Sequence, residues 1–293
     1  MKKTISFPKF DAELNTDVCD AYNNAELTLT LRLGFRQINP AGGAATGTYH
    51  DYGDATEPTR KIVKWTAVQW SAWKQNFVTS AQTFWHGKFW LINDGGNFSF
   101  DRGGVTYVPN IWCRVKVTAH DATEAGNHHT IDVVRLDRTE NWFGSHSTLY
   151  DSLDTNLVRK ARDSANKPIM QRAHVHEVGH LLGLGHVDIG KAHCPAAGDT
   201  NTAQCYGVAD QDKQSVMGSG MKLRPDHARP WREAIRAFVA DELLSGRGGL
   251  AGYFVLPISL IAPWKAELAR HYPRTLDEVK RGVAIISRVK RAA

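Results

Sequence analysis

The residues with the clearest chemical potential lie between His176 and His186. His176 and His180 are four positions apart, so on a helix both imidazoles project from one face and can bind one metal ion. Glu177 follows the first histidine and is placed to reach a water molecule rather than the metal. Gly183 suits the left-handed residue that ends a helix, after which the reversed chain can deliver His186 as a third ligand. Zinc favours such nitrogen ligands, and a catalytic zinc keeps one position open for water.

These residues form the pattern H-E-x-x-H-x-x-G-x-x-H, and Met217 follows His186 by thirty-one positions. Together with the segment 215–218, the pattern resembles the signature of the metzincin clan of zinc metalloendopeptidases, in which a methionine turn follows the third histidine. The resemblance implies one Zn²⁺ per chain, bound by the three histidines. It also implies that Glu177 is the general base and that Met217 forms an apolar floor beneath the imidazoles.

The resemblance does not identify a subfamily. Val187, the residue after the third histidine, is not one of those that mark the matrixins, astacins, serralysins or adamalysins. In some of these families a tyrosine two residues past the methionine assists the zinc site, but this chain has Ser219 there. An assisting side chain must therefore come from elsewhere, and the candidates are Tyr206, His193 and Tyr107.

Hydrophobic periodicity predicts the elements that position these side chains. Apolar residues alternate along 27–36, which predicts a strand with one buried face. Apolar residues recur at spacings of three and four along 66–86, which predicts a long amphipathic helix. Two further strands are expected at 112–119 and 130–136, and residues 39–57 are expected to form a surface loop.

The metal-binding helix is expected to begin after Pro168, a residue suited to a first helical turn. Met170 would then lie on the buried side together with Val178 and Leu182, opposite the two histidines. A later helix is expected from about residue 230, ending near Gly246.

This order of elements predicts an α/β (α+β) fold of the metzincin type. A twisted, mostly parallel sheet and long helices would form an upper subdomain, about 1–185, with the active-site helix at the floor of a cleft. A small irregular lower subdomain, about 186–245, would end in a helix and complete the catalytic domain 1–245. Residues 246–293 are expected to be a C-terminal extension with an apolar run and a basic helix.

Composition is that of a globular protein of 293 residues, with 42% hydrophobic and 23% charged residues. The formal net charge is +6, but residues 265–293 alone carry eight Lys or Arg against three Asp or Glu. The rest of the chain is therefore nearly neutral, which argues against a nucleic-acid partner. The basic tail is a candidate for contact with a membrane surface or an acidic partner, and oligomeric state is left open.

Four cysteines occur without a C-x-x-C pair. Cys194 and Cys205 bracket a polar loop and are the candidate disulfide, which would stiffen that loop; a Cys19–Cys113 bond is the weaker expectation. Disulfides would place the protein in an oxidising compartment. Asp199, Asp210 and Asp212 are a candidate Ca²⁺ site, and the alternative is that they belong to an ordinary polar loop.

The N-terminal residues show no clear signal peptide, because Pro8, Lys9 and Asp11 interrupt any apolar core. No transmembrane helix is expected, since the longest uncharged run, 248–264, is short and contains prolines. The expected location is outside the cytosol, by secretion or delivery.

The leading function is a zinc-dependent endopeptidase that hydrolyses protein or peptide substrates, in the role of a secreted or delivered protease or toxin. One alternative is a peptidase restricted to a small peptide or a cell-wall bond. A second is a non-catalytic zinc-containing binding protein with a C-terminal targeting segment. Glu177 speaks against this last reading, because a structural zinc needs no general base.

Overall fold

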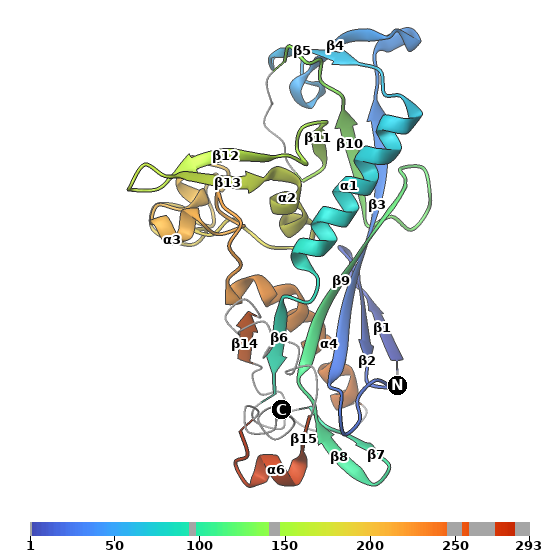
Figure 1. Ribbon diagram of the computed structural model, residues 1–293, viewed down its shortest axis with the longest axis vertical. Coiled ribbons are helices and arrows are strands. Elements are labelled where there is room, and N and C mark those ends of the chain that lie inside the picture. Colours follow the sequence, from blue (N-terminus) through green and yellow to red (C-terminus); the bar gives the residue numbers. More distant parts are fainter. Residues whose placement is uncertain (1, 94–97, 141–146, 245–253, 258–272, 285–293) are drawn as a thin grey trace. The chain divides into compact units, whose positions relative to one another are not determined.

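The computed structural model describes residues 2–93, 98–140, 147–244, 254–257 and 273–284 (Figure 1). The chain forms a mixed α/β fold with two compact units. Unit 1 consists of Met1–Thr30, Trp85–Lys116 and Leu223–Ala293, and unit 2 of Leu31–Phe84 and Val117–Lys222. The expected boundary near residue 185 falls inside unit 2, and the expected boundary at residue 245 lies outside the described residues.

Unit 2 contains the candidate metal ligands. Its helices are α1 (Ala67–Trp85, whose last residue belongs to unit 1), α2 (Ala173–Leu181), α3 (Asp210–Lys213) and the 3₁₀ helices η1 (Ala41–Gly43), η2 (Asp51–Gly53) and η3 (Ala203–Tyr206). Its strands are β4 (Thr46–His50), β5 (Thr59–Val63), β10 (His129–Val134), β11 (Leu149–Asp151), β12 (Leu157–Arg162), β13 (Pro168–Arg172) and the later residues of β3 (Ala25–Ile38) and β9 (Ile111–Asp121).

Unit 1 contains the earlier residues of β3 and β9 together with both ends of the chain. Its other elements are β1 (Lys2–Ser6), β2 (Asp11–Asn15), β6 (Phe89–Ile92), β7 (Phe100–Arg102), β8 (Val105–Val108), β14 (Phe254–Pro257), β15 (Arg274–Thr275), η4 (Pro225–Ala228), α4 (Arg229–Leu244) and α6 (Leu276–Lys280).

The expected long strand and long helix are confirmed as β3 and α1. Leu27, Leu29, Leu31 and Leu33 alternate on the buried face of β3, as the sequence pattern predicts. Trp73 and Phe77 on α1 are buried, and their rings lie 5.8 and 5.2 Å from the ring of Phe35 on β3. Figure 1 shows α1 running beside β3. The ring of Phe77 also contacts Tyr150 of β11 at 5.1 Å and His174 of α2 at 5.0 Å, so these aromatic contacts join α1 to neighbouring elements of unit 2.

The prediction of a mostly parallel sheet is wrong. Only β3 with β10 and β10 with β11 are parallel pairs among the pairings described, whereas β1 with β2, β2 with β3, β6 with β9 and β6 with β14 are antiparallel. The alternation of apolar and polar residues in β3 agrees with the observed arrangement, since near-continuous apolar runs are typical of buried parallel strands.

The metal-binding helix begins later than predicted. Pro168–Arg172 forms β13, which pairs antiparallel with β12, and α2 starts only at Ala173. Met170 is on this strand and is 36% exposed, so it does not join Val178 in the core. Pairing with β12 overrides the helix start that the proline suggested.

The expected loop at 39–57 is also partly wrong. Thr46–His50 is the strand β4, which pairs antiparallel with β5, and the 3₁₀ helices η1 and η2 flank it. The polar composition of the segment reflects an exposed hairpin rather than an irregular loop.

The expected helix near residue 230 is confirmed as α4 in unit 1. Trp231, Ile235 and Phe238 recur on one face of α4 and are buried. The indole nitrogen of Trp231 donates to the carbonyl oxygen of Arg114 at 2.8 Å, and its ring packs against Phe89 at 5.7 Å. These contacts attach α4 to the sheet of unit 1.

Just before α4, His227 is 1% exposed and accepts the backbone N–H of Arg224 at Nδ1, 3.0 Å away. Burial lowers the pKa of His227 to about 4; Asp226 opposes this shift and Arg224 adds to it. The ordinary pKa of an unfolded histidine is about 6.5. Just below that pH the unfolded chain therefore binds a proton at His227, whereas the folded protein keeps this imidazole neutral.

Replacing His227 with asparagine is expected to reduce acid destabilisation, because asparagine keeps an acceptor for Arg224 but does not titrate. In the wild type the stabilisation by neutral His227 is complete above pH 6.5 and is lost as the pH falls towards 4, a total of roughly 3 kcal/mol. Urea unfolding at pH 7 and pH 4.5 should show a smaller difference for His227→Asn than for the wild type. Equal differences would contradict this account.

Most of the expected C-terminal extension lies outside the described residues, including nearly all of the apolar run 248–264 and the last nine residues. Of the expected basic helix, the described part holds α6, whose N-cap Thr275 accepts the backbone N–H of Glu278 at 3.3 Å. None of the helices in the described part of the chain has the length and apolar character needed to cross a membrane.

Candidate metal centre

Helix α2 is held in unit 2 by the face opposite its ligands. His174 is fully buried, and its Nε2 lies 2.5 Å from Oγ of Ser80 on α1, while its Nδ1 lies 3.1 Å from the carbonyl oxygen of Asp154. Its ring also packs against Phe77, at 5.0 Å. His174 is therefore buried and fixes α2 to α1.

The end of α2 turns the chain back towards the helix. Gly183 adopts φ +97°, a left-handed conformation that favours glycine. The backbone N–H of Leu184 donates to the carbonyl oxygen of Gly179 at 2.9 Å, and that of Gly183 donates to His180 at 2.8 Å. This is the hydrogen-bonding pattern that closes a helix C-terminus, and it leaves His186 on the returning chain.

The three histidines come together at their Nε2 atoms. Nε2 of His180 lies 3.1 Å from Nε2 of His176 and 3.0 Å from Nε2 of His186, and one potential ligand atom from each residue lies within 4.8 Å of the others. Two nitrogens bound at about 2.0–2.1 Å to one tetrahedral ion would be roughly 3.3–3.4 Å apart. The arrangement is therefore close to that of a zinc site, and it is the one such group of three or more ligands within the described residues.

Each of these imidazoles is oriented by a backbone carbonyl oxygen at its other nitrogen. Nδ1 of His176 lies 2.7 Å from the oxygen of Val216, Nδ1 of His180 lies 2.8 Å from that of Leu184, and Nδ1 of His186 lies 2.7 Å from that of Thr200. A carbonyl can only accept, so each Nδ1 must carry the proton. The three Nε2 lone pairs then face one another, which is unfavourable without a cation between them.

The surroundings favour the neutral forms of His176 and His186. Burial, followed by the proximity of His180, lowers the pKa of His176 well below its usual range, and burial lowers the pKa of His186. Neutral imidazole is the form that binds a metal ion. The described residues thus fit a divalent ion that prefers nitrogen ligands, as zinc does.

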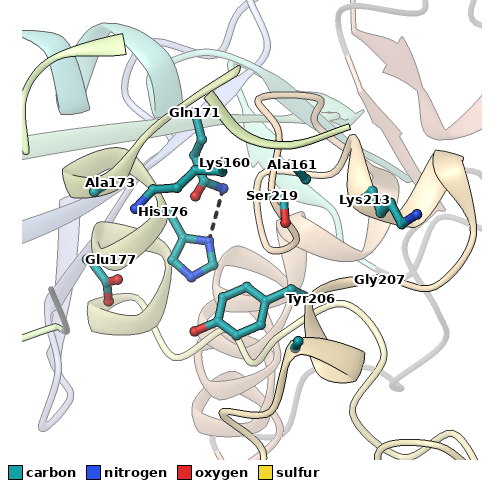
Figure 2. Close-up of a pocket in the computed structure, with 11 residues that line it drawn as sticks. Lys160, Ala161, Gln171, Ala173, His176, Glu177, Tyr206, Gly207, Lys213 and Ser219 are labelled. Carbon is teal, nitrogen blue, oxygen red and sulfur yellow. Dashed lines mark hydrogen bonds between the residues drawn. The ribbon is translucent and has the colours of Figure 1, made fainter. Parts of the chain in front are cut away.

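Glu177 lies on the same helix and shares a cavity of about 360 Å³ with His176. Figure 2 shows both side chains beside this cavity, which is otherwise lined by Lys160, Ala161, Gln171, Ala173, Ala203, Tyr206, Gly207, Lys213 and Ser219. Burial raises the pKa of Glu177 to about 8, and Asp154 adds to the shift while Lys160 opposes it. A bound divalent cation would shift this pKa downwards.

Met217 is 1% exposed and belongs to the loop Ser215–Gly220. Its carbonyl oxygen accepts the backbone N–H of Val187, next to the third histidine, at 3.0 Å. The loop therefore supports the ligands through its backbone. A role for the methionine side chain as an apolar floor stays a prediction.

Cys194 and Cys205 are joined by a disulfide, whereas Cys19 and Cys113 are buried free thiols, so the weaker expected pair is not formed. The Cys194–Cys205 bond closes the segment that contains Thr200, whose carbonyl oxygen orients His186. It thus stiffens a part of the chain that the site uses directly.

Of the three candidate assisting residues, Tyr206 is the one beside the histidines. Its ring centroid lies 3.9 Å from that of His186 and 5.6 Å from that of His176. In Figure 2 the Tyr206 ring lies below His176 and its hydroxyl points towards the side of Glu177. His193 instead contacts Asp188, with Nε2 and Oδ2 2.8 Å apart, and Tyr107 belongs to unit 1.

The candidate calcium residues do not form a cluster of ligands within the described chain. Asp210 accepts from the backbone of Ser164 at 3.0 Å, and Asp212 accepts from Lys191 at 2.8 Å. Lys191 also bonds the fully buried Asp188. These aspartates fasten the polar loops to one another rather than gathering around an ion.

The hydrogen-bond partners of the three histidines were not predicted from the sequence. The orienting carbonyl oxygens of Val216, Leu184 and Thr200 belong to the backbone, so no residue type marks them. Gln171 and Lys160 line the cavity from the hairpin β12–β13, a position that depends on recognising Pro168–Arg172 as a strand.

No family model, curated protein or solved structure matches the chain. The case for a function therefore rests on the residues and their geometry.

Proposed function

We propose that this chain is a zinc-dependent endopeptidase of the metzincin type, with His176, His180 and His186 as the metal ligands and Glu177 as the general base. One observation carries the proposal: three Nε2 atoms converge while each Nδ1 is held by a carbonyl oxygen. A catalytic rather than structural role is supported by Glu177, because a structural site has no use for a carboxylate on the wall of an adjoining cavity.

When bound, a zinc ion supplies Lewis acidity, which polarises a peptide carbonyl and lowers the pKa of water. The carboxylate of Glu177 accepts a proton from the attacking water and later gives it to the departing amine nitrogen. Burial favours the protonated form of Glu177 and so helps it to hold the proton between these two transfers. The cavity offers room for substrate beside this carboxylate.

An extended substrate would lie along β12. Lys160 and Ala161 of this strand line the cavity together with Glu177. Addition of an extended peptide to the edge of a sheet supplies backbone hydrogen bonds that do not depend on side chains. This arrangement suits an enzyme that cleaves within unfolded or extended segments of protein.

The first test is the metal content of the purified chain, measured together with cleavage of an unstructured protein such as casein. About one zinc per chain, and cleavage that a chelator abolishes and zinc restores, would support the proposal. Zinc without cleavage of casein or of a peptide library would contradict the endopeptidase assignment and favour a zinc-containing binding protein.

We further propose that Tyr206 assists the reaction by donating its phenolic hydrogen to the oxyanion that forms on the scissile carbonyl. Tyr206→Phe is expected to lower kcat by about 10²-fold, the effect of removing one oxyanion donor. Metal affinity should be unchanged, because the ring that packs against His186 is retained. The exposed Tyr22 of unit 1 supplies the control, Tyr22→Phe. Equal activity of the two variants would remove Tyr206 from the mechanism.

We also propose that the enzyme works outside the cytosol, after secretion or delivery. The Cys194–Cys205 disulfide supports this location, because such bonds persist in oxidising compartments and are rare in the cytosol. Detection of the active protein only in a reduced, cytosolic fraction of the producing cell would contradict it.

A further inference from the structure

Gln171 joins the strand before the metal-binding helix to the loop Ser215–Gly220. It lies on β13, two residues before α2, and is 4% exposed. Its amide nitrogen lies 2.8 Å from the carbonyl oxygen of Gly218, 3.1 Å from that of Gly220 and 3.2 Å from that of Val216. Because carbonyl oxygens can only accept hydrogen bonds, the part of the Gln171 amide that faces the loop must be its NH₂ group.

The loop that Gln171 holds orients His176 and also contacts the backbone next to His186. The carbonyl oxygen of Val216 accepts from Nδ1 of His176 at 2.7 Å. The next carbonyl, that of Met217, accepts the backbone N–H of Val187, the residue after His186, at 3.0 Å. A displacement of this loop would therefore move the hydrogen-bond partner of His176 and the backbone contact next to His186 at once.

Close backbone packing leaves the loop few other positions. A Cβ atom on Gly218 would overlap the carbonyl oxygen of Asp212, and one on Gly220 would overlap that of Gln214. Both glycines are thus in contact with neighbouring backbone on one side, while their own carbonyl oxygens face Gln171 on the other. Both glycines are buried, and the amide of Gln171 donates to the carbonyl oxygen of each.

The amide of Gln171 also lies near the ring of His176. Its nitrogen lies 3.4 Å from Nδ1 of His176, the approach drawn as a dashed line in Figure 2. The two amide hydrogens are best placed for the two nearest oxygens, those of Gly218 and Gly220. Val216 is then left to accept the Nδ1 proton of His176, and Nε2 keeps the lone pair that a metal ion needs.

We propose that Gln171 is a positioning residue of the metal centre, acting through the loop Ser215–Gly220 to fix the tautomer and direction of His176. The inference rests on the metal site of the proposed function but not on its peptidase activity. It assigns to Gln171 a part of the zinc affinity of the chain, since partners that orient a ligand typically account for about 10- to 100-fold in metal affinity.

The test compares Gln171→Met, similar in size but without a donor, with Gln171→Glu, similar in shape but with a carboxylate against the carbonyl oxygens. Gln211 on the exposed face of α3 gives the matched controls Gln211→Met and Gln211→Glu. The zinc Kd is measured by competition with a coloured chelator, and the visible spectrum of the cobalt form reports ligand geometry. The stability of each metal-free variant is measured separately in urea.

Both Gln171 variants are expected to bind zinc about 10- to 100-fold more weakly than the wild type and to give an altered cobalt spectrum, while the controls match the wild type. A folded Gln171→Met protein with the wild-type Kd and cobalt spectrum would overturn the inference. Reduced stability of the metal-free protein with an unchanged Kd would also overturn it, because that is the signature of a merely structural residue.

A measurement on the wild type covers the case in which neither variant folds. Nitrogen-15 spectra of the histidine rings in the metal-free protein, with His176 assigned from its absence in His176→Ala, should show a proton on Nδ1 that exchanges slowly. A proton on Nε2, or rapid exchange at Nδ1, would overturn the inference. Wild-type protein that binds zinc with this tautomer but hydrolyses no peptide would contradict the proposed function alone.

Discussion

Replacement of Glu177 by glutamine is expected to lower the rate of peptide hydrolysis by about 10²–10⁴-fold, the usual contribution of a general acid–base group. The variant should still bind about one zinc ion per chain. Glutamine has nearly the same shape as the buried carboxyl but cannot accept the proton of the attacking water. Elemental analysis and cleavage of casein, measured on the same samples, separate the two effects.

Glu57, an exposed residue of unit 2, provides the matched control Glu57→Gln, which should retain full activity. The comparison also decides between the proposed enzyme and a zinc-containing binding protein. If Glu177→Gln cleaves as fast as the wild type, Glu177 is not the base, and the catalytic reading of the cavity fails.

Removal of a metal ligand should have the other large effect. Zinc bound at small protein sites by four ligands is held by about 10–16 kcal/mol, or roughly 2.5–4 kcal/mol per ligand if shared equally. His180→Ala is therefore expected to weaken zinc binding by about 10²–10³-fold and to abolish cleavage at micromolar zinc. His180 is the informative choice because its Nε2 contacts those of both other histidines.

His120, which contacts Glu124 and Thr118 in the same unit, gives the control His120→Ala, and this variant should keep its zinc. Retention of wild-type zinc affinity by His180→Ala would place the metal elsewhere in the chain. Recovery of cleavage at high zinc would instead agree with a weakened but otherwise intact site.

The approach of the three histidines to one another could be predicted from the sequence because it depends almost entirely on local geometry. A helix sets the spacing of His176 and His180, and the left-handed Gly183 sets the reversal that returns His186. Both conditions involve residues close together in the chain. The candidate disulfide was similarly local, since only ten residues separate Cys194 from Cys205.

The elements around the site were harder to predict because they depend on distant partners. Pro168–Arg172 is a strand because β12 pairs with it, and no local feature of Pro168 distinguishes this strand from a first helical turn. The pairing of strands in the sheet was hard to predict for the same reason. The strands beside β3 are β2, β9 and β10, and the sequence pattern of β3 does not indicate which strands pair with it.

The other residues of the candidate site were the hardest to predict from the sequence. Gln171 meets Gly218 across forty-seven positions, and the partner atoms of the ligands are backbone oxygens that every residue possesses. Tyr206 could be named as a candidate only from its residue type. Its packing against His186 depends on the course of the loop between the third histidine and the methionine turn.

The disulfide has a thermodynamic consequence for the metal centre. The loop that it closes presents the carbonyl oxygen of Thr200 to His186, and Tyr206 follows directly after Cys205. In the proposed metal centre, disulfide formation and metal binding would stabilise the same loop conformation, and such coupling is reciprocal. Oxidation of the two thiols would then raise the affinity for the ion, and a bound ion would in turn make the disulfide harder to reduce.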